Sequence, residues 1–305
     1  MKRLFILLFS IILLLSACNT NEEKNKDDES SKTEKDTITY ESENGPIKVP
    51  AHPKRVVVLS QFTGDLLKLG VNVVGVDSWA KDNPRFKELK DVETVSEDNL
   101  EKIIELKPDL IIGLSTTKNL DKLKEIAPTV TYTYGKVDYL TQHIEIGKLV
   151  NKEKEAREWV ENFKKETAEV GKQIKDKIGK DATVSVIEKF DKQWYVFGNN
   201  WGRGTEILYQ AMGLKMPESV KKHALKDGYY ALSEEVIPKF AGDYLIISDQ
   251  SGAKDTSYLK SDIFQSIPAV KKGNVFVIDG KKFYFNDAST LEFQLEFFKE
   301  KFLGE

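Results

Sequence analysis

Cysteine and histidine are scarce in this sequence. The 305 residues include one Cys, Cys18, and three His. A disulfide within the chain is therefore impossible, and a metal site built from several Cys or His side chains has few residues to draw on. His52, His143 and His223 fall in a lead-in loop, a long helical segment and a late loop, so we expect them on the surface. The sequence predicts no metal held by protein side chains.

Common catalytic motifs are absent as well. The sequence contains no Gly-x-Ser-x-Gly, no His-Glu-x-x-His and no glycine-rich phosphate loop, which are arrangements that carry hydrolysis or nucleotide binding. No residue stands out as a nucleophile beside a base. We therefore expect no enzymatic activity and no cofactor, with a surface-anchored hydrolase as the remote alternative.

An excess of positive charge is also lacking. The chain has 46 Lys and Arg against 49 Asp and Glu, a formal net charge of -3. Proteins that bind nucleic acid depend on a basic surface to neutralise phosphates. We therefore expect no nucleic-acid partner.

A long apolar run is present only at the N-terminus. Lys2 and Arg3 precede a nearly uninterrupted apolar run at residues 4–15. This run is too short to span a bilayer as a mature helix and is typical of a signal peptide. The Leu-Ser-Ala-Cys that follows and ends at Cys18 resembles a bacterial lipobox, in which the Cys becomes the lipidated first residue. We predict a lipoprotein signal peptide over residues 1–18, with a plain signal peptide and an incidental Cys as the alternative.

Residues 19–36 contain no aromatic or aliphatic side chain and are dense in Lys, Glu, Asp and Ser. Such a segment cannot bury apolar surface and is expected to be disordered. As a flexible tether it would hold the folded part at an r.m.s. distance on the order of 20–25 Å from the membrane. The sequence thus predicts a lipid-anchored protein on the extracellular face of the cell membrane.

Strands and helices alternate after the tether, and we place an N-terminal α/β lobe at residues 37–138. The continuous apolar run at 56–59 suits a strand buried on both faces of a parallel sheet. An amphipathic helical pattern at 100–106 ends at Pro108, and an apolar strand follows at 110–112. Strand, helix and strand at this spacing predict a parallel sheet.

A second α/β lobe is predicted for residues 179–305, where the same kind of alternation recurs. We expect strands at 183–187, 194–197, 243–248 and 275–278, and helices at 204–212, 234–240 and 291–302.

Residues 139–178, between the two lobes, form the longest helical pattern in the chain. The segment has no Pro, and apolar residues recur at helical spacing among Lys and Glu. One interpretation is a pair of helices packed on one sheet. The other is a single long helix joining two lobes, which would limit hinge motion.

Four segments carry a resemblance to a known family. The helix that ends in Lys-Pro-Asp-Leu-Ile-Ile, at residues 100–112, looks like the siderophore and cobalamin class of ABC-importer binding proteins. The stretches at 194–210, 127–130 and 283–287 are similar to the Gram-positive ferric-hydroxamate-binding lipoproteins of FhuD type. The resemblance covers essentially the whole chain. It implies two Rossmann-like α/β lobes joined by one long α-helix, with a ligand cleft between them.

The same resemblance implies a ligand and a partner. The ligand would be a preformed Fe(III)-hydroxamate siderophore complex of ferrichrome or ferrioxamine type, and the partner would be the permease of an ABC importer. We expect the chain to act as a monomer that delivers this ligand for iron uptake.

The residues around Trp201 suit such a ligand. A hydroxamate siderophore surrounds Fe(III) with three bidentate oxygen pairs, so its complex is bulky and close to neutral. A site for it needs aromatic walls and a few hydrogen-bond donors, and no metal ligand from the protein. Trp194, Tyr195 and Phe197 precede Trp201, and Arg203 follows between two glycines. An Arg offers several donors and stacks on aromatic rings, although alternate residues of a strand must face the core.

By resemblance, the ligand-binding residues would be Tyr134, Tyr195, Trp201, Arg203 and Tyr284, with Phe62 and Trp79 as weaker candidates near strand ends. Tyr284 takes a position where the family more often has Trp. Arg203 could instead hydrogen-bond a carboxylate of its own lobe.

Two glutamates match the positions at which members of this class dock on the permease. They are Glu101 in the first lobe and Glu235 in the second. Each lies in the first turn of a predicted helix, where the helix dipole favours a carboxylate. Asp98 and Glu101 also form the pattern of a capping box, so a purely structural role is the alternative for Glu101.

Other ligands remain open within the class. A metal ion would need converging His and carboxylate ligands. Haem would need an axial ligand, for which Tyr134 could serve. A catecholate siderophore, which is tri-anionic, would favour a cluster of basic groups, whereas the matched positions offer one Arg.

Overall fold

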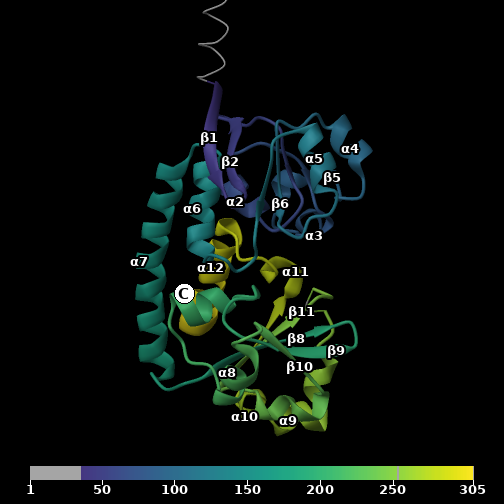
Figure 1. Cartoon of the computed structure of the whole chain (residues 1–305). Helices are drawn as coiled ribbons and strands as arrows, with labels where there is room; N and C mark the ends of the chain where they lie inside the picture. Colours follow the sequence, from purple (N-terminus) through teal and green to yellow (C-terminus); the bar gives the residue numbers. More distant parts are fainter. Residues whose placement is uncertain (1–35, 253, 305) are drawn as a thin grey trace, which may run out of the picture.

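The computed structural model describes residues 36–252 and 254–304, which form two lobes (Figure 1). The predicted signal peptide, Cys18 and all but the last residue of the predicted tether lie outside the described residues. Each lobe is built around a five-stranded sheet. Within the described part of the chain, no helix combines the length and the apolarity that a membrane span requires.

The N-terminal lobe has a fully parallel sheet. Its strands, in order across the sheet, are β5 (Glu93–Thr94), β4 (Val73–Val76), β3 (Val56–Val58), β6 (Leu110–Leu114) and β7 (Thr129–Tyr132). Helices α2 (Thr63–Lys68), α3 (Ser78–Lys81), α4 (Leu100–Glu105) and α5 (Leu120–Ile126) connect them, and the hairpin β1 (Thr37–Ser42) and β2 (Gly45–Pro50) precedes them.

Both faces of this sheet are buried. Val56 and Val58 belong to one hydrophobic cluster and Val57 belongs to another, because successive side chains of a strand point to opposite faces. This arrangement explains why β3 is continuously apolar, as the sequence predicted.

The C-terminal sheet is mixed. Its order is β10 (Tyr229–Leu232), β9 (Gln193–Phe197), β8 (Val184–Phe190), β11 (Tyr244–Asp249) and β12 (Val275–Asp279). Strands β8, β11 and β12 run parallel, whereas β9 is antiparallel to both of its neighbours. The cause is local, since Phe190 pairs with Gln193 across a two-residue loop and such a loop can join only antiparallel strands.

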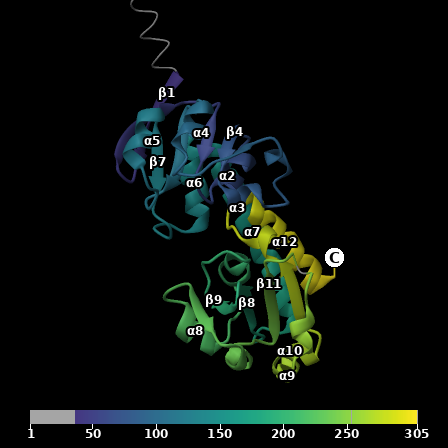
Figure 2. The same ribbon diagram turned by 90° about the vertical axis from the view of Figure 1, so that its right-hand side faces the viewer.

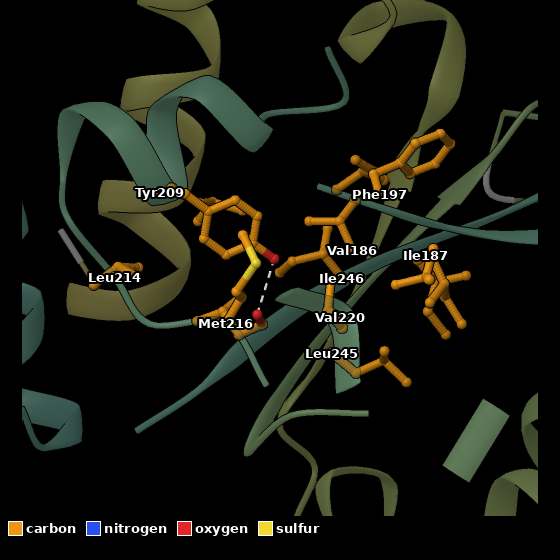
Figure 3. Packing of buried hydrophobic residues seen from close by; sticks show 14 of the residues in the cluster. Val186, Ile187, Phe197, Tyr209, Leu214, Met216, Val220, Leu245 and Ile246 are labelled. Carbon is orange, nitrogen blue, oxygen red and sulfur yellow. Dashed lines mark hydrogen bonds between the residues drawn. The ribbon is translucent and has the colours of Figure 1, made fainter. Parts of the chain in front are cut away.

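The core of the C-terminal lobe lies against this sheet (Figure 3). Val186 and Ile246 of adjacent strands pack beneath the helical turn η3 (Glu206–Ala211). Tyr209 reaches into the core from this turn, and its hydroxyl donates a hydrogen bond of 2.9 Å to the carbonyl of Val184. Helices α8 (Glu218–Ala224), α9 (Asp262–Ser266) and α10 (Pro268–Lys271) and the 3₁₀ turns η4 (Glu234–Lys239) and η5 (Ser257–Lys260) complete the lobe.

The segment 139–178 is not one helix as the second interpretation held, because it breaks at residues 150–152; its longer part, α7 (Glu153–Ile178, 26 residues), joins the lobes. A shorter helix, α6 (Tyr139–Leu149), precedes it. Ala156 of α7 is buried in the core of the N-terminal lobe, whereas Phe163 and Ile174 are buried in the core of the C-terminal lobe. Because α7 contributes to both cores, it is a rigid connection, and the fold class predicted from the sequence is confirmed.

The chain crosses between the lobes again near its C-terminus. After β12 and the short helix α11 (Gly280–Phe283), Phe285 packs into the core of the N-terminal lobe. Helix α12 (Ala288–Leu303) then packs against α7, which runs along one side of both lobes in Figure 1, and α12 crosses in front of α7 in Figure 2. Two helices therefore support the junction, which restricts hinge motion more than one helix would.

Three buried polar residues meet at this junction. Asp65 of α2 lies 2.8 Å from Nδ1 of His143, and its carboxylate accepts a hydrogen bond of 3.0 Å from the backbone N–H of Ala288. Asp287 caps α12 and lies against Gly64, where an added Cβ would overlap its carboxylate. His143 is only 1% exposed. The expectation that all three His are surface residues is thus wrong for His143, because α6 turns this face toward Asp65.

The buried carboxyl of Asp287 should make stability depend on pH. Burial, and then the nearby charge of Asp65, raises the pKa of Asp287 from 3.8 to about 7. Between these values the folded state binds more protons than the unfolded state, so the free energy of unfolding falls as pH rises. This group accounts for at most about 1.4 kcal/mol per pH unit. Asp287→Asn keeps an acceptor for the N–H of Thr290 and should flatten that fall.

Urea unfolding at several values between about pH 5 and about pH 8 measures this effect. Asp121→Asn is the control, because the Asp121 side chain is fully exposed. An unchanged slope in Asp287→Asn would show that this carboxyl is ionised throughout the range.

Candidate functional site

Two adjoining cavities lie between the lobes. The larger, of about 330 Å³, is called here the polar chamber, and the smaller, of about 180 Å³, the aromatic chamber. Gln61 and Tyr134 of the N-terminal lobe and Asn286 of the C-terminal segment line both of them. The two chambers therefore form one continuous cleft between the lobes.

Arg203 forms one wall of the aromatic chamber. Its guanidinium carbon lies 4.9 Å from the ring centroid of Phe197 and 4.4 Å from that of Tyr284. The backbone of Arg203 is left-handed, with φ of 55°, and its N–H donates to the carbonyl of Phe283 at 2.7 Å. The tight backbone path thus sets a cation between two aromatic rings at the edge of the cavity.

A carboxylate behind this wall fixes the guanidinium. Nη2 of Arg203 donates to Oε1 of Glu188 at 2.9 Å, and Nε donates to Oε2 at 3.3 Å. Glu188 is 1% exposed and also accepts hydrogen bonds from Ser248 and Gln250. Arg203 therefore does bind a carboxylate of its own lobe, which was the alternative to a ligand-binding role. It nevertheless lines the cavity as well.

Tyr284 joins the two lobes by stacking. Its ring lies 4.4 Å from that of Trp79 at an interplanar angle of 16°, and Trp79 belongs to the N-terminal lobe. Trp79 is 45% exposed and lines neither chamber. It covers the face of Tyr284 and so helps to hold the ring that faces Arg203.

Trp201 belongs to a row of four aromatic rings that begins at the aromatic chamber. Tyr134 contacts Trp201 edge to face at 5.5 Å, Trp201 contacts Tyr229 at 5.0 Å, and Tyr229 contacts Tyr195 at 5.9 Å. Tyr134 and Trp201 line the aromatic chamber, whereas Tyr195 lies at the far end of the row and lines neither chamber. Sequence reasoning missed Tyr229, although Tyr229 and Tyr230 form an adjacent aromatic pair on β10.

The polar chamber is dominated by side-chain amides. They belong to Gln61, Gln142, Asn199, Asn200, Gln210 and Asn286. Phe62 also lines this chamber from the core of the N-terminal lobe, where it is 1% exposed. Some of these amides could have been found from the sequence, because Asn199, Asn200 and Asn286 lie inside the aromatic motifs.

Glu206 is a buried carboxyl at the boundary of the chambers. Its Oε1 accepts hydrogen bonds from the backbone N–H of Gly202 at 3.1 Å and from Nδ2 of Asn286 at 2.9 Å. Burial raises the pKa of Glu206. Sequence reasoning missed this residue, which connects the glycine-rich loop at residues 202–204 to the segment that contains Tyr284.

The two proposed docking glutamates lie on different lobes. Glu101 is in the first turn of α4 and Glu235 is in the first turn of η4, and both are exposed. The side chain that caps α4 is Asn99, whose Oδ1 accepts from the N–H of Lys102 at 3.1 Å. The capping box predicted for Asp98 and Glu101 is therefore wrong, because the helix starts one residue later than that pattern requires.

No cluster of three or more His, Cys, Asp or Glu side chains that could hold a metal ion occurs among residues 36–252 and 254–304.

Comparisons with known proteins match the chain over most of its length. Residues 56–281 match the family model described as periplasmic binding protein. The chain is 39% identical to the iron(3+)-hydroxamate-binding protein FhuD of Bacillus subtilis, over 98% of this chain and 97% of that protein. It is 31% identical to the Fe(3+)-citrate-binding protein YfmC of the same organism, over 88% and 85%. The structure of Staphylococcus aureus FhuD2 with bound ferrioxamine B matches with a TM-score of 0.78 and 39% identity, covering 83% of this chain and 99% of that one.

The glycine-rich loop offers a test of how the cleft is held. A Cβ at Gly202, whose φ is 67°, would overlap the carbonyl oxygen of Tyr284. Gly213 has nearly the same φ, 66°, but an added Cβ there meets only Nζ of Lys175 at 3.5 Å. Gly213→Ala should therefore cost about 1 kcal/mol for the backbone conformation alone. Gly202→Ala should cost at least about 1 kcal/mol more, because the Tyr284 segment must move.

Urea unfolding of both variants checks this difference. Equal losses in the two variants would mean that the contact between Gly202 and Tyr284 contributes nothing to stability.

Proposed function

The chain belongs to the periplasmic binding protein family, and we propose that it is a lipid-anchored receptor that binds ferric hydroxamate siderophores and delivers them to an ABC-importer permease. The observation that carries the proposal is the position of Arg203 at the wall of an interlobe cavity. There its guanidinium lies between two aromatic rings. The relatives described above support the ligand class, since one is named for iron(3+)-hydroxamate and another holds ferrioxamine B.

The donor capacity of Arg203 suits hydroxamate oxygens. A guanidinium carries five N–H donors, and three of them are used by Glu188 and by the carbonyl of Trp201. Two N–H groups thus remain for a ligand. Because Glu188 already fixes the guanidinium, binding costs little further side-chain entropy.

Haem is a poorer fit for the same cleft. Tyr134, the candidate axial ligand, donates its hydroxyl proton to the carbonyl of Asn200 at 2.9 Å. Burial raises the pKa of Tyr134, whereas coordination of haem iron by a phenolate requires an easily lost proton. The hydroxamate complex needs no such ligand from the protein.

The first test is direct binding. The full-length chain in detergent should bind ferrioxamine B with strong quenching of Trp emission, because Trp201 would lie beside an iron centre that absorbs light. Trp201→Phe should lose much of this quenching, while Trp194→Phe, at a buried core position, should retain it. Binding of catecholate complexes or free iron without any binding of ferrioxamine B would contradict the proposal.

The second test concerns delivery to the permease. Charges at the rim of an interface steer and align a complex, so Glu101→Arg combined with Glu235→Arg should abolish most siderophore uptake by cells. Siderophore affinity should stay within a few-fold, because both residues are exposed and line neither chamber. Glu234→Arg is the matched control, since Glu234 neighbours Glu235 in the same turn. Normal uptake by the double variant at normal surface levels would assign both glutamates a structural role only.

A further inference from the structure

Glu188 is a buried carboxylate that does not itself line either chamber. It is 1% exposed, lies at the carboxyl-terminal part of β8 and accepts four hydrogen bonds. Two come from Arg203, one from the hydroxyl of Ser248 and one from Nε2 of Gln250. With this many donors, the charge of Glu188 is stabilised immediately behind the guanidinium.

This carboxylate changes what Arg203 offers to a ligand. A guanidinium alone attracts anions through its charge and its donors together. Paired with Glu188, it contributes almost no net charge, and two of its five N–H groups are not used in the hydrogen bonds to Glu188 and Trp201. The wall of the aromatic chamber is therefore a hydrogen-bonding surface that is close to neutral.

The rest of the cleft adds no surplus of positive charge. Two cationic side chains line the chambers, Arg203 and Lys136. Nζ of Lys136 lies 3.2 Å from a carboxylate oxygen of Glu43. Three acidic residues, Asp65, Asp138 and Glu206, also line the polar chamber. Among the residues that line the two chambers, an anionic ligand would thus meet only cationic side chains that are already paired with a glutamate.

We infer that Glu188 is a specificity-determining residue, which makes the cleft select uncharged or cationic ferric chelates over anionic ones by neutralising Arg203. The inference rests on the proposed function and adds the electrostatic basis of ligand choice. One relative, 31% identical over 88% of this chain, is named for Fe(3+)-citrate, an anionic chelate, so the charge of the named ligand differs among the relatives of this chain.

The test compares two probes that differ in charge. N-acetylated ferrioxamine B is an uncharged ferric hydroxamate, and Fe(III)-citrate is anionic. Their dissociation constants are measured by Trp quenching with the full-length chain in detergent, at low and at high salt. Glu188→Gln removes the charge and keeps the size of the side chain. It should shift the ratio of the two dissociation constants toward citrate by about tenfold or more, less so at high salt.

A second variant covers the case in which Glu188→Gln fails to fold. Gln250 is half-buried and donates to Glu188, so Gln250→Lys would place an ammonium beside the carboxylate and offset its charge while Arg203 keeps its partner. The ratio should shift in the same direction by a smaller factor. Ser248→Ala is the control, because it removes one hydrogen bond to Glu188 and no charge; its ratio should match that of the wild type.

The outcomes separate this inference from the proposed function. If the wild type binds acetylated ferrioxamine B and every folded variant keeps the wild-type ratio, Glu188 only supports the structure and the inference fails alone. If the wild type binds citrate and not the hydroxamate, the proposed function fails with it.

Discussion

The placement of residues 283–287 is the constraint on which both the junction and the cleft depend. At one end of this segment, the carbonyl of Phe283 accepts the N–H of Arg203, and at the other, Asp287 caps α12 against Gly64. Between them, Phe285 is buried in the core of the N-terminal lobe, and Gln294 of α12 donates to the carbonyls of Phe283 and Phe285. A movement of one lobe relative to the other would therefore disturb the ring that faces Arg203.

Much of the fold could be predicted because its signals are local. The apolar runs that became β3 and β6 could be read directly, since both faces of a parallel sheet are buried. The errors arise where tertiary structure decides. The helix expected at 234–240 is a 3₁₀ turn that contains Pro238, and the helix expected at 204–212 has π-type hydrogen bonds. Strand β5 has only two residues and leaves no pattern to detect.

In the candidate site too, the residues that belong to local motifs could be predicted, whereas their partners from distant parts of the chain could not. Trp201, Arg203 and Tyr284 lie in short motifs whose composition marks them, and the structure brings all three to the aromatic chamber. The partners that give them their properties come from elsewhere in the chain. Glu188 is separated from Arg203 by a strand and a loop, and Trp79 reaches Tyr284 from the other lobe. His143 was misplaced for the same reason, because no pattern on α6 reveals that Asp65 faces it.

The buried ion pair of Arg203 and Glu188 is difficult to explain by stability alone. Removing two charges from water costs several kcal/mol per ion, and apolar residues of similar volume often replace a buried pair with no loss of stability. A pair of this kind is therefore better explained by what it presents to the cavity. In this cleft it presents a guanidinium that lies against two rings, is held by Glu188 and carries almost no net charge together with it. A ligand that brings its own iron and many oxygen acceptors, and little charge of its own, matches those properties.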